Sequence, residues 1–266
     1  MKILIAGDSF CNKLGHEESD FAWTRQLENM LYRSKVTCTG QGASSVFSAL
    51  LQVKEQLEID SSYDTVIVIV TNHDRLYQTS YPLITNLPHA LMQKKLYLGS
   101  NANDERAFNK IEAARMYYEF LHEHDLGVFI LESCLKELQH IVGNRRLILF
   151  PAFQTFKDSA FADNLLGEHG FTLLDIVHRE NENFNKMFDK EWMLKFVDRV
   201  SIGSDPFGKV NHISTGNQTL LARYFAQLIH FGKSEIKLNI FSVLPKKDFH
   251  LYYRPIDQLI YKDGNF

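Results

Sequence analysis

Continuous apolar runs constrain the fold of this chain more than any other feature of its sequence. The clearest runs cover residues 2–6, 65–70, 146–150 and 171–176, and a weaker one covers residues 35–39. A strand that is apolar on both faces is typical of a parallel sheet with helices packed on each side. The runs therefore predict a mostly parallel central sheet.

Segments with helical periodicity separate these runs. They cover residues 22–32, 46–58, much of 105–142, and 215–231. A chain in which strands alternate with helices folds as a doubly wound α/β sheet, because each crossover connection places a helix on one face. We therefore predict an α/β fold with helices on both faces of the sheet.

The 266 residues are enough for one large domain or two small ones. We expect one α/β domain over residues 1–232, with an inserted loop at about 76–104, where tyrosines and prolines interrupt any periodicity. Residues 233–266 form an expected C-terminal arm, with strand-like pieces at 236–243 and 249–253, that packs on the body of the protein or on a partner.

The composition excludes several classes of protein. The net charge of −3 disfavours a nucleic-acid partner that is bound through its phosphates. Three scattered cysteines, Cys11, Cys38 and Cys134, are too few for a disulfide framework. The first apolar run is too short for a signal peptide, and no window has the length of a membrane helix. We therefore expect a cytoplasmic protein with no membrane partner.

The sequence predicts neither a metal nor an organic cofactor. The run from His122 to Asp125 contains two histidines, but residues two apart on a helix point in nearly opposite directions, so we expect a solvated helix face. The chain also lacks the glycine-rich and histidine motifs of dinucleotide, P-loop and zinc-protease sites.

A candidate nucleophile follows the first apolar run. Gly7-Asp8-Ser9 comes directly after this run, and α/β sheets bind their ligands at the carboxyl ends of parallel strands. His212 lies just ahead of the last predicted helix, where it could act as the general base for Ser9. Taken singly, each is also an ordinary turn or loop residue.

Candidate oxyanion donors follow the next two strands. Gly42 lies in a Gly-Ala-Ser-Ser segment that opens a helix, and its backbone N–H has no side chain beside it. Asn72 and His73 follow the strand at residues 65–70 and offer side-chain donors. These segments are also suited to helix caps and turns.

Taken together, these motifs resemble the SGNH hydrolase superfamily, often called GDSL esterases and lipases. The resemblance covers about residues 2–75 and 200–231. It implies a three-layer α/β/α sandwich with a flavodoxin-like sheet. It also assigns the catalytic serine to Ser9, an oxyanion N–H to Gly42 and the catalytic histidine to His212.

The chain departs from the family pattern in two blocks. In the third block, aligning Asp74 with the final Asp of Gly-x-Asn-Asp places His73 at the asparagine position, with Asn72 one residue early; both remain candidate donors. In the fourth block, Asp-x-x-His, the residue three before His212 is Lys209. Asp205 is then the nearest carboxylate for a triad, and a Ser-His dyad is the alternative.

The resemblance implies an ester hydrolase that acts on a small-molecule or carbohydrate acyl ester, such as an acetyl ester, without a cofactor. Two alternatives stay open: a catalytically degenerate binding or structural module, and an O-acyltransferase that acts on carbohydrate. The C-terminal arm is also a candidate contact for a homo-oligomer.

Overall fold

The computed structural model describes residues 1–11, 22–42, 44–73, 75–78, 84, 86–99, 104–153, 169–180, 204–205, 213, 215–241 and 254–255. The chain forms two compact units, which are described separately below. The first comprises Met1–Leu83, Glu123–Ile176 and Ile213–Ser242, and the second Ile84–His122, Val177–His212 and Val243–Phe266.

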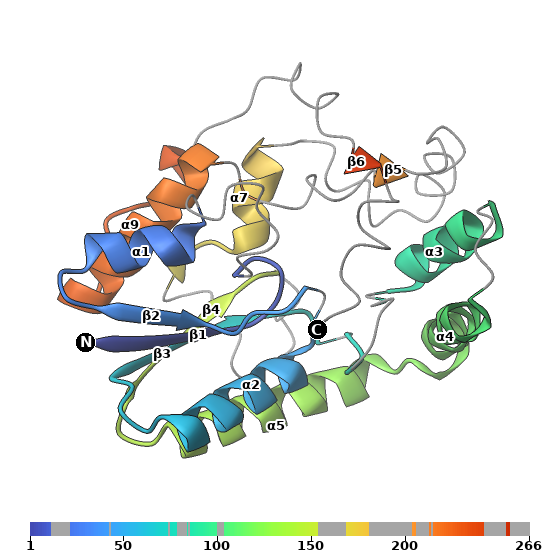
Figure 1. The fold of residues 1–266 in the computed structure, drawn as a ribbon, viewed down its shortest axis with the longest axis horizontal. Helices are drawn as coiled ribbons and strands as arrows, with labels where there is room; N and C mark the ends of the chain where they lie inside the picture. Colours follow the sequence, from blue (N-terminus) through green and yellow to red (C-terminus); the bar gives the residue numbers. More distant parts are fainter. Residues whose placement is uncertain are drawn as a thin grey trace. The chain divides into compact units, whose positions relative to one another are not determined.

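A four-stranded parallel sheet forms the centre of the first unit (Figure 1). Its strands are β1 (Lys2–Ala6), β2 (Lys35–Cys38), β3 (Thr65–Val70) and β4 (Arg146–Pro151). Their order, β2-β1-β3-β4, is that of the flavodoxin-like doubly wound sheet. The prediction of a mostly parallel sheet is confirmed, and so are the runs that correspond to these four strands.

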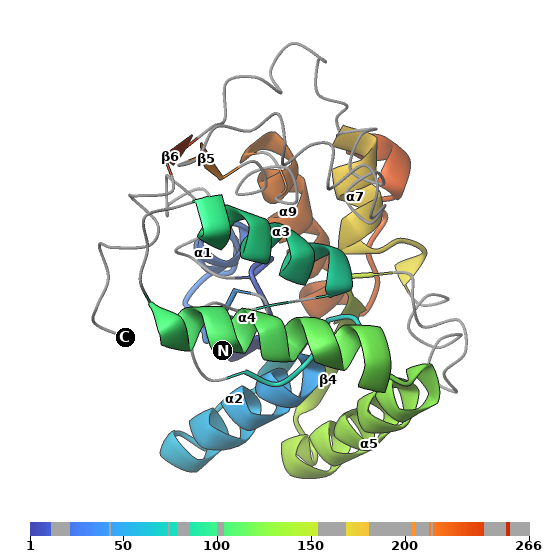
Figure 2. The same ribbon diagram turned by 90° about the vertical axis from the view of Figure 1, so that its right-hand side faces the viewer.

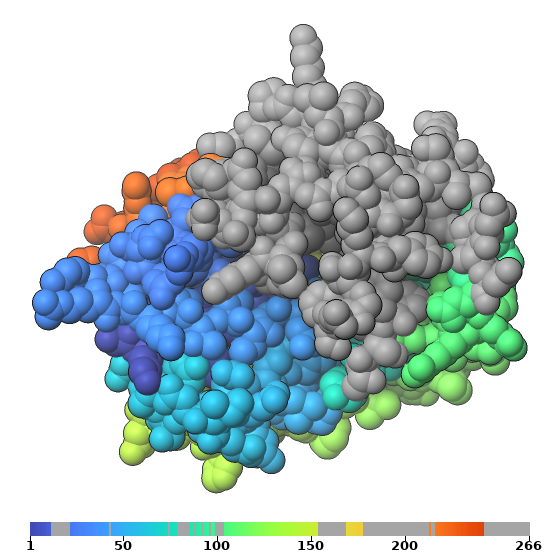
Figure 3. Space-filling model, in the orientation of Figure 1, coloured from blue at the N-terminus to red at the C-terminus, as the bar shows by residue number. Residues whose placement is uncertain are grey.

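Helices cover both faces of this sheet (Figure 1). The helices on one face are α1 (Trp23–Met30) and α9 (Thr215–Phe231), and those on the other are α2 (Val46–Ile59) and α5 (His124–Val142). Figure 3 shows the outward surfaces of α1 and α2 in shades of blue. The predicted three-layer α/β/α arrangement is therefore confirmed.

Apolar packing holds these layers together. On the side of α2 and α5, alternate residues of β3 pack against Leu131, Leu135 and Leu138, which recur at helical spacing along one face of α5. On the other side, Trp23 of α1 stacks on Phe225 of α9 with ring centroids 4.6 Å apart. Both faces of the sheet are therefore buried beneath helices, as the continuous apolar strands require.

The run at 171–176 is not a strand, which corrects the sequence prediction. It leads into helix α7 (Leu173–Glu180). The Asp175 backbone N–H donates to Thr172 Oγ1 at 3.1 Å, and the Thr172 backbone N–H donates to Asp175 Oδ2 at 2.7 Å. This capping box starts a helix, and Leu173, Ile176 and Val177 are then buried at helical spacing.

The interval predicted as an inserted loop contains helix α3 (Leu87–Gly99). The side chain of Asn86 accepts a hydrogen bond from the His89 backbone N–H at 2.8 Å, which caps the first turn. Figure 2 shows α3 beside α4 (Glu105–Met116), and both belong to the second unit. A π-helix, η3 (Tyr117–Leu121), follows α4, so the long helical segment is interrupted before α5 begins.

The C-terminal arm differs from its predicted strands where the structure describes it. The segment at 236–243 contains a 3₁₀ turn, η5 (Leu238–Ile240), and residues 249–253 lie outside the described residues. Short strands β5 (Ser204–Asp205) and β6 (Arg254–Pro255) pair antiparallel in the second unit. The division into a domain and an arm remains a prediction. Among the described residues, no helix is both long and apolar enough to cross a bilayer.

Candidate active site

Ser9 lies in the turn that follows β1. The turn is closed by a hydrogen bond from the Cys11 backbone N–H to the Asp8 carbonyl oxygen, at 3.2 Å. Asp8 is fully buried, whereas Ser9 is half-buried. Among the described residues, neither the hydroxyl nor the backbone N–H of Ser9 has a hydrogen-bond partner. Both groups are therefore available to a ligand at the carboxyl edge of the sheet.

The loop after β2 is hydrogen-bonded to the loop of Ser9. The Gly7 carbonyl oxygen accepts the Gln41 backbone N–H at 3.1 Å and the Ser44 hydroxyl at 2.7 Å. Gly42 lies between these two donors, and its own N–H meets no acceptor within the described part of the chain. A Cβ atom added to Gly42 would have nothing within 4 Å. Gly42 thus lies, with open space at its Cα, on the loop that is hydrogen-bonded to the loop of Ser9.

The loop after β3 contains the two candidate side-chain donors. Asn72 is half-buried, and His73 is buried. His73 Nε2 shares a hydrogen bond of 3.0 Å with Nδ1 of His124, the first residue of α5. Gly127, one turn further along α5, packs directly against the His73 ring. The His73 ring is thereby fixed against α5, and the choice between Asn72 and His73 remains a prediction.

Arg75 connects the Ser9 turn to the neighbouring loops. Its Nη1 atom donates to Asp8 Oδ2 at 2.7 Å and to the Ser44 carbonyl oxygen at 3.2 Å. The other carboxylate oxygen of Asp8 accepts the Phe10 backbone N–H at 3.1 Å. The buried charge of Asp8 is therefore paired, and both of its oxygens are used.

Cys11 is not a competing nucleophile. Burial raises the pKa of its thiol well above the usual range, and the neighbouring Cys38 thiol and the Asp8 carboxylate raise it further. A thiol attacks as its thiolate, so a raised pKa leaves Cys11 inert near neutral pH. Ser9 remains the candidate nucleophile of this turn.

The predicted base and acid are not described together with the Ser9 turn. His212 lies outside the described residues. Asp205 is in β5 of the second unit, where its backbone is paired with that of Arg254 in β6. The contact between Ser9 and His212, and the choice between a triad with Asp205 and a dyad, therefore remain predictions.

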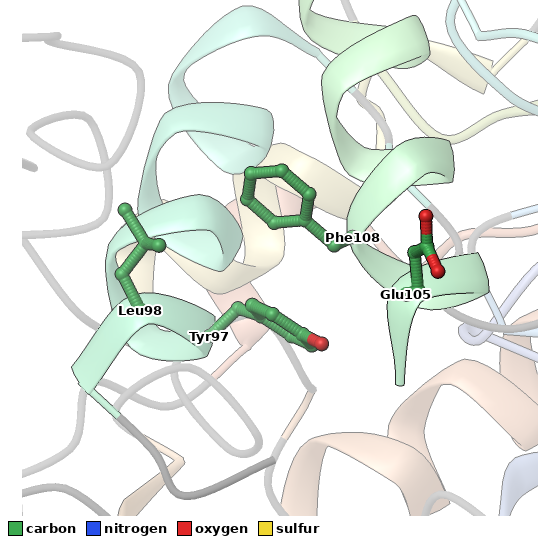
Figure 4. Close-up of a pocket in the computed structure, with 4 residues that line it drawn as sticks. All are labelled: Tyr97, Leu98, Glu105 and Phe108. Atoms are coloured by element: carbon green, nitrogen blue, oxygen red, sulfur yellow. The ribbon is translucent and has the colours of Figure 1, made fainter. Parts of the chain in front are cut away.

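A hollow of about 300 Å³ lies elsewhere, in the second unit (Figure 4). Tyr97 and Leu98 of α3 and Glu105 and Phe108 of α4 line it. These four side chains include no serine, cysteine or histidine. Among the described residues, no group of three or more histidine, cysteine or acidic side chains is arranged to hold a metal ion.

The chain is similar over most of its length to solved structures of other proteins. One is a carbohydrate acetylesterase family member from Sinorhizobium meliloti, with 10% identity over 86% of this chain and 97% of that chain and a TM-score of 0.41. Another is a member of the lipolytic protein G-D-S-L family from Veillonella parvula DSM 2008, with 12% identity, coverage of 87% and 98%, and a TM-score of 0.39. No protein-family model and no curated protein matches the sequence.

The resemblance to the SGNH hydrolases rests on the motifs around Ser9 and Gly42. Arg75 was not among the predicted site residues; His124, predicted to lie on a solvated helix face, is exposed and also shares the hydrogen bond with His73. The signals were present, since Arg75 directly follows the third block and His124 is the first residue after a break between two helices.

Proposed function

We propose that this protein is a serine hydrolase of the esterase type that cleaves an acyl ester. The observation that supports the proposal is the pair of backbone N–H groups at Ser9 and Gly42. They lack protein acceptors among the described residues, and they lie on two loops that are joined because donors of the Gly42 loop bind the Gly7 carbonyl oxygen of the Ser9 loop. Unpaired N–H groups beside a serine hydroxyl are what an acyl-transfer oxyanion hole requires.

In the proposed reaction, Ser9 Oγ attacks the ester carbonyl carbon while His212 takes the hydroxyl proton. The backbone N–H groups of Ser9 and Gly42, with a third donor from Asn72 or His73, hold the oxyanion of the tetrahedral intermediate. His212 then gives its proton to the leaving alcohol, and water hydrolyses the acyl-enzyme. Asp205 orients His212 in the triad form; in the dyad form, a backbone carbonyl group does so.

The substrate class follows from the resemblance to the SGNH hydrolases. Small acyl esters, and acetyl esters of carbohydrates in particular, are the first substrates to assay. The Ser9 mechanism needs neither a metal nor an organic cofactor. An O-acyltransferase would use the same Ser9 chemistry, and analysis of products in the presence of a sugar acceptor separates it from a hydrolase.

The proposal is tested by intact-protein mass spectrometry after treatment with a fluorophosphonate probe at neutral pH. We expect one adduct on the wild type and none on Ser9→Ala or His212→Ala. Ser62→Ala is the control, because Ser62 is exposed at the opposite edge of the sheet, and it should label like the wild type. A wild type that stays unlabelled beside a reactive control hydrolase, or an adduct that survives Ser9→Ala, would refute the proposal and favour a binding or structural module.

A further inference from the structure

We propose that Arg75 is a positioning residue that holds the oxyanion hole of this site in register. The inference rests on the proposed hydrolase function and assigns a role to a side chain outside the family motifs. Its basis is that one guanidinium group, carried by the loop after β3, contacts the loops that follow the other three strands of the sheet.

The polar contacts of Arg75 join the two loops that carry the backbone donors. Through Asp8 it holds the turn of Ser9, because Asp8 Oδ1 fixes the Phe10 backbone N–H on the far side of that serine. Through the Ser44 carbonyl oxygen it holds the loop of Gly42, two residues away. A single nitrogen atom, Nη1, makes both contacts. A displacement of either loop therefore changes the geometry of the hydrogen bond between Nη1 and the other loop.

An aromatic contact adds the loop after β4. The guanidinium carbon lies 4.9 Å from the ring centroid of Phe153, within the range of a cation–π interaction. The Phe153 ring also packs edge-on against Phe10, with centroids 6.1 Å apart. Arg75 itself lies on the loop after β3. The planar guanidinium group thus contacts Phe153 with its face and Asp8 and Ser44 with its edge. The ammonium group of a lysine could not make both kinds of contact.

Asp8 is buried and Arg75 is largely buried, so the loss of the ion pair between them would affect the surrounding loops. The side chain of Asp8 has no exposed area, and that of Arg75 is 11% exposed. A buried carboxylate that loses its cation must find water or move. Movement of Asp8 would release the Phe10 N–H and rotate the Ser9 turn relative to Gly42. Oxyanion stabilisation depends on donors that already point at one position, so the effect falls on the chemical step.

The kinetic test compares Arg75→Gln with Arg145→Gln on an ester that the wild type cleaves. Arg145 is a matched control, since its guanidinium group also donates two hydrogen bonds, here to two backbone carbonyl groups at the amino edge of the sheet. We expect Arg75→Gln to lower kcat about 10- to 100-fold with KM within about twofold, and Arg145→Gln to leave both unchanged. Equal kcat values for the two variants, or a change confined to KM, would overturn the inference.

Two further variants separate positioning from a folding defect. The double variant Asp8→Asn with Arg75→Gln removes the unpaired buried charge, and it should fold while keeping the loss in kcat. Arg75→Ala should regain several-fold in kcat with tens of millimolar guanidinium chloride and nothing with urea. Guanidinium is a denaturant, so it would not rescue a variant that is merely unstable. Absence of rescue together with wild-type kcat in the double variant would contradict the role.

Amide hydrogen exchange tests the inference without any catalytic readout. In Arg75→Gln, the amides of Phe10 and Ser44 should exchange faster than in Arg145→Gln, because both loops lose their common anchor. Unchanged exchange at both amides would overturn the positioning role, whether or not the protein is an esterase. Failure of the proposed function is detected separately, by the absence of a Ser9-dependent fluorophosphonate adduct on the wild type.

Discussion

At the scale of single residues, Gly7 shows what the Gly-Asp-Ser turn demands of the backbone. Its φ is +146°, and an added Cβ would lie 2.8 Å from Ile69 Cβ and 2.9 Å from the Ile69 carbonyl oxygen. A side chain at this position is therefore strained by its own backbone and also clashes with the neighbouring strand β3. We expect Gly7→Ala to lower the free energy of unfolding by about 2–4 kcal/mol, measured by urea denaturation.

Gly143 provides the matched control for this prediction. Its φ is also positive, at +61°, but an added Cβ would meet nothing within 4 Å. Gly143→Ala should therefore cost only the backbone term, about 1 kcal/mol. If the two alanine variants lose the same stability, the contact with β3 does not explain why glycine occupies position 7.

The sequence predicted the positions of Ser9 and Gly42 better than the side-chain contacts around them. Their positions were predictable because each follows an apolar strand, and parallel strands end at one edge; their role as backbone donors remains a prediction. The link from Arg75 to Asp8, Ser44 and Phe153 was not predictable, because it depends on which loop each side chain meets after folding. The partners of His212 and Asp205 remain predictions for the same reason.

At the scale of secondary-structure elements, the approach of α5 to the loop after β3 depends on Gly127. A Cβ atom there would lie 2.8 Å from His73 Cδ2 and 3.2 Å from the His73 carbonyl oxygen. Replacing a helical glycine by alanine ordinarily stabilises a helix by up to about 1 kcal/mol. We expect Gly127→Ala to destabilise the protein instead, because either α5 or the loop that carries Asn72 and His73 must move to make room for the Cβ atom. Thermal unfolding measures the loss.

The control at this scale is Gly216, an exposed residue in the first turn of α9, where an added Cβ meets no atom within 4 Å. Gly216→Ala should raise stability by a few tenths of a kcal/mol. A stabilising Gly127→Ala would mean that the loop after β3 adapts freely. In that case, His73 is not held against α5 as the structure indicates.

Helices and strands were predictable where a single sequence signal, such as a continuous apolar run, dominated. Strands β1, β3 and β4 are apolar after their first residue, and their bounds agree with the predicted runs within one residue. The run at 171–176 was misassigned because it has strand-like composition, while the Thr172–Asp175 capping box that starts α7 was overlooked. Helix α3 was missed because Pro88 was treated as a breaker, although proline is tolerated in a first turn.

At the scale of the whole molecule, the buried thiols make stability depend on pH in the alkaline range. Burial raises the pKa of Cys134, in the core between the sheet and α5, to about 11 from its ordinary value of 9.0. The unfolded chain therefore loses this proton at a lower pH than the folded protein does. It follows that the folded state loses stability as the pH rises from about 9 toward 11.

This dependence can be assigned to Cys134 by comparing the wild type with Cys134→Ala and Cys134→Val. Both variants lack the titrating thiol but fill the core to different extents, so packing changes the level of stability and titration changes its slope with pH. We expect both to show a flatter decline than the wild type between pH 9 and 11, with a difference of up to about 2–3 kcal/mol across that range. Urea unfolding followed by circular dichroism measures it. Equal slopes in all three proteins would show that the Cys134 thiol ionises alike in the folded and unfolded states, and that its burial contributes nothing to the alkaline limit of the fold.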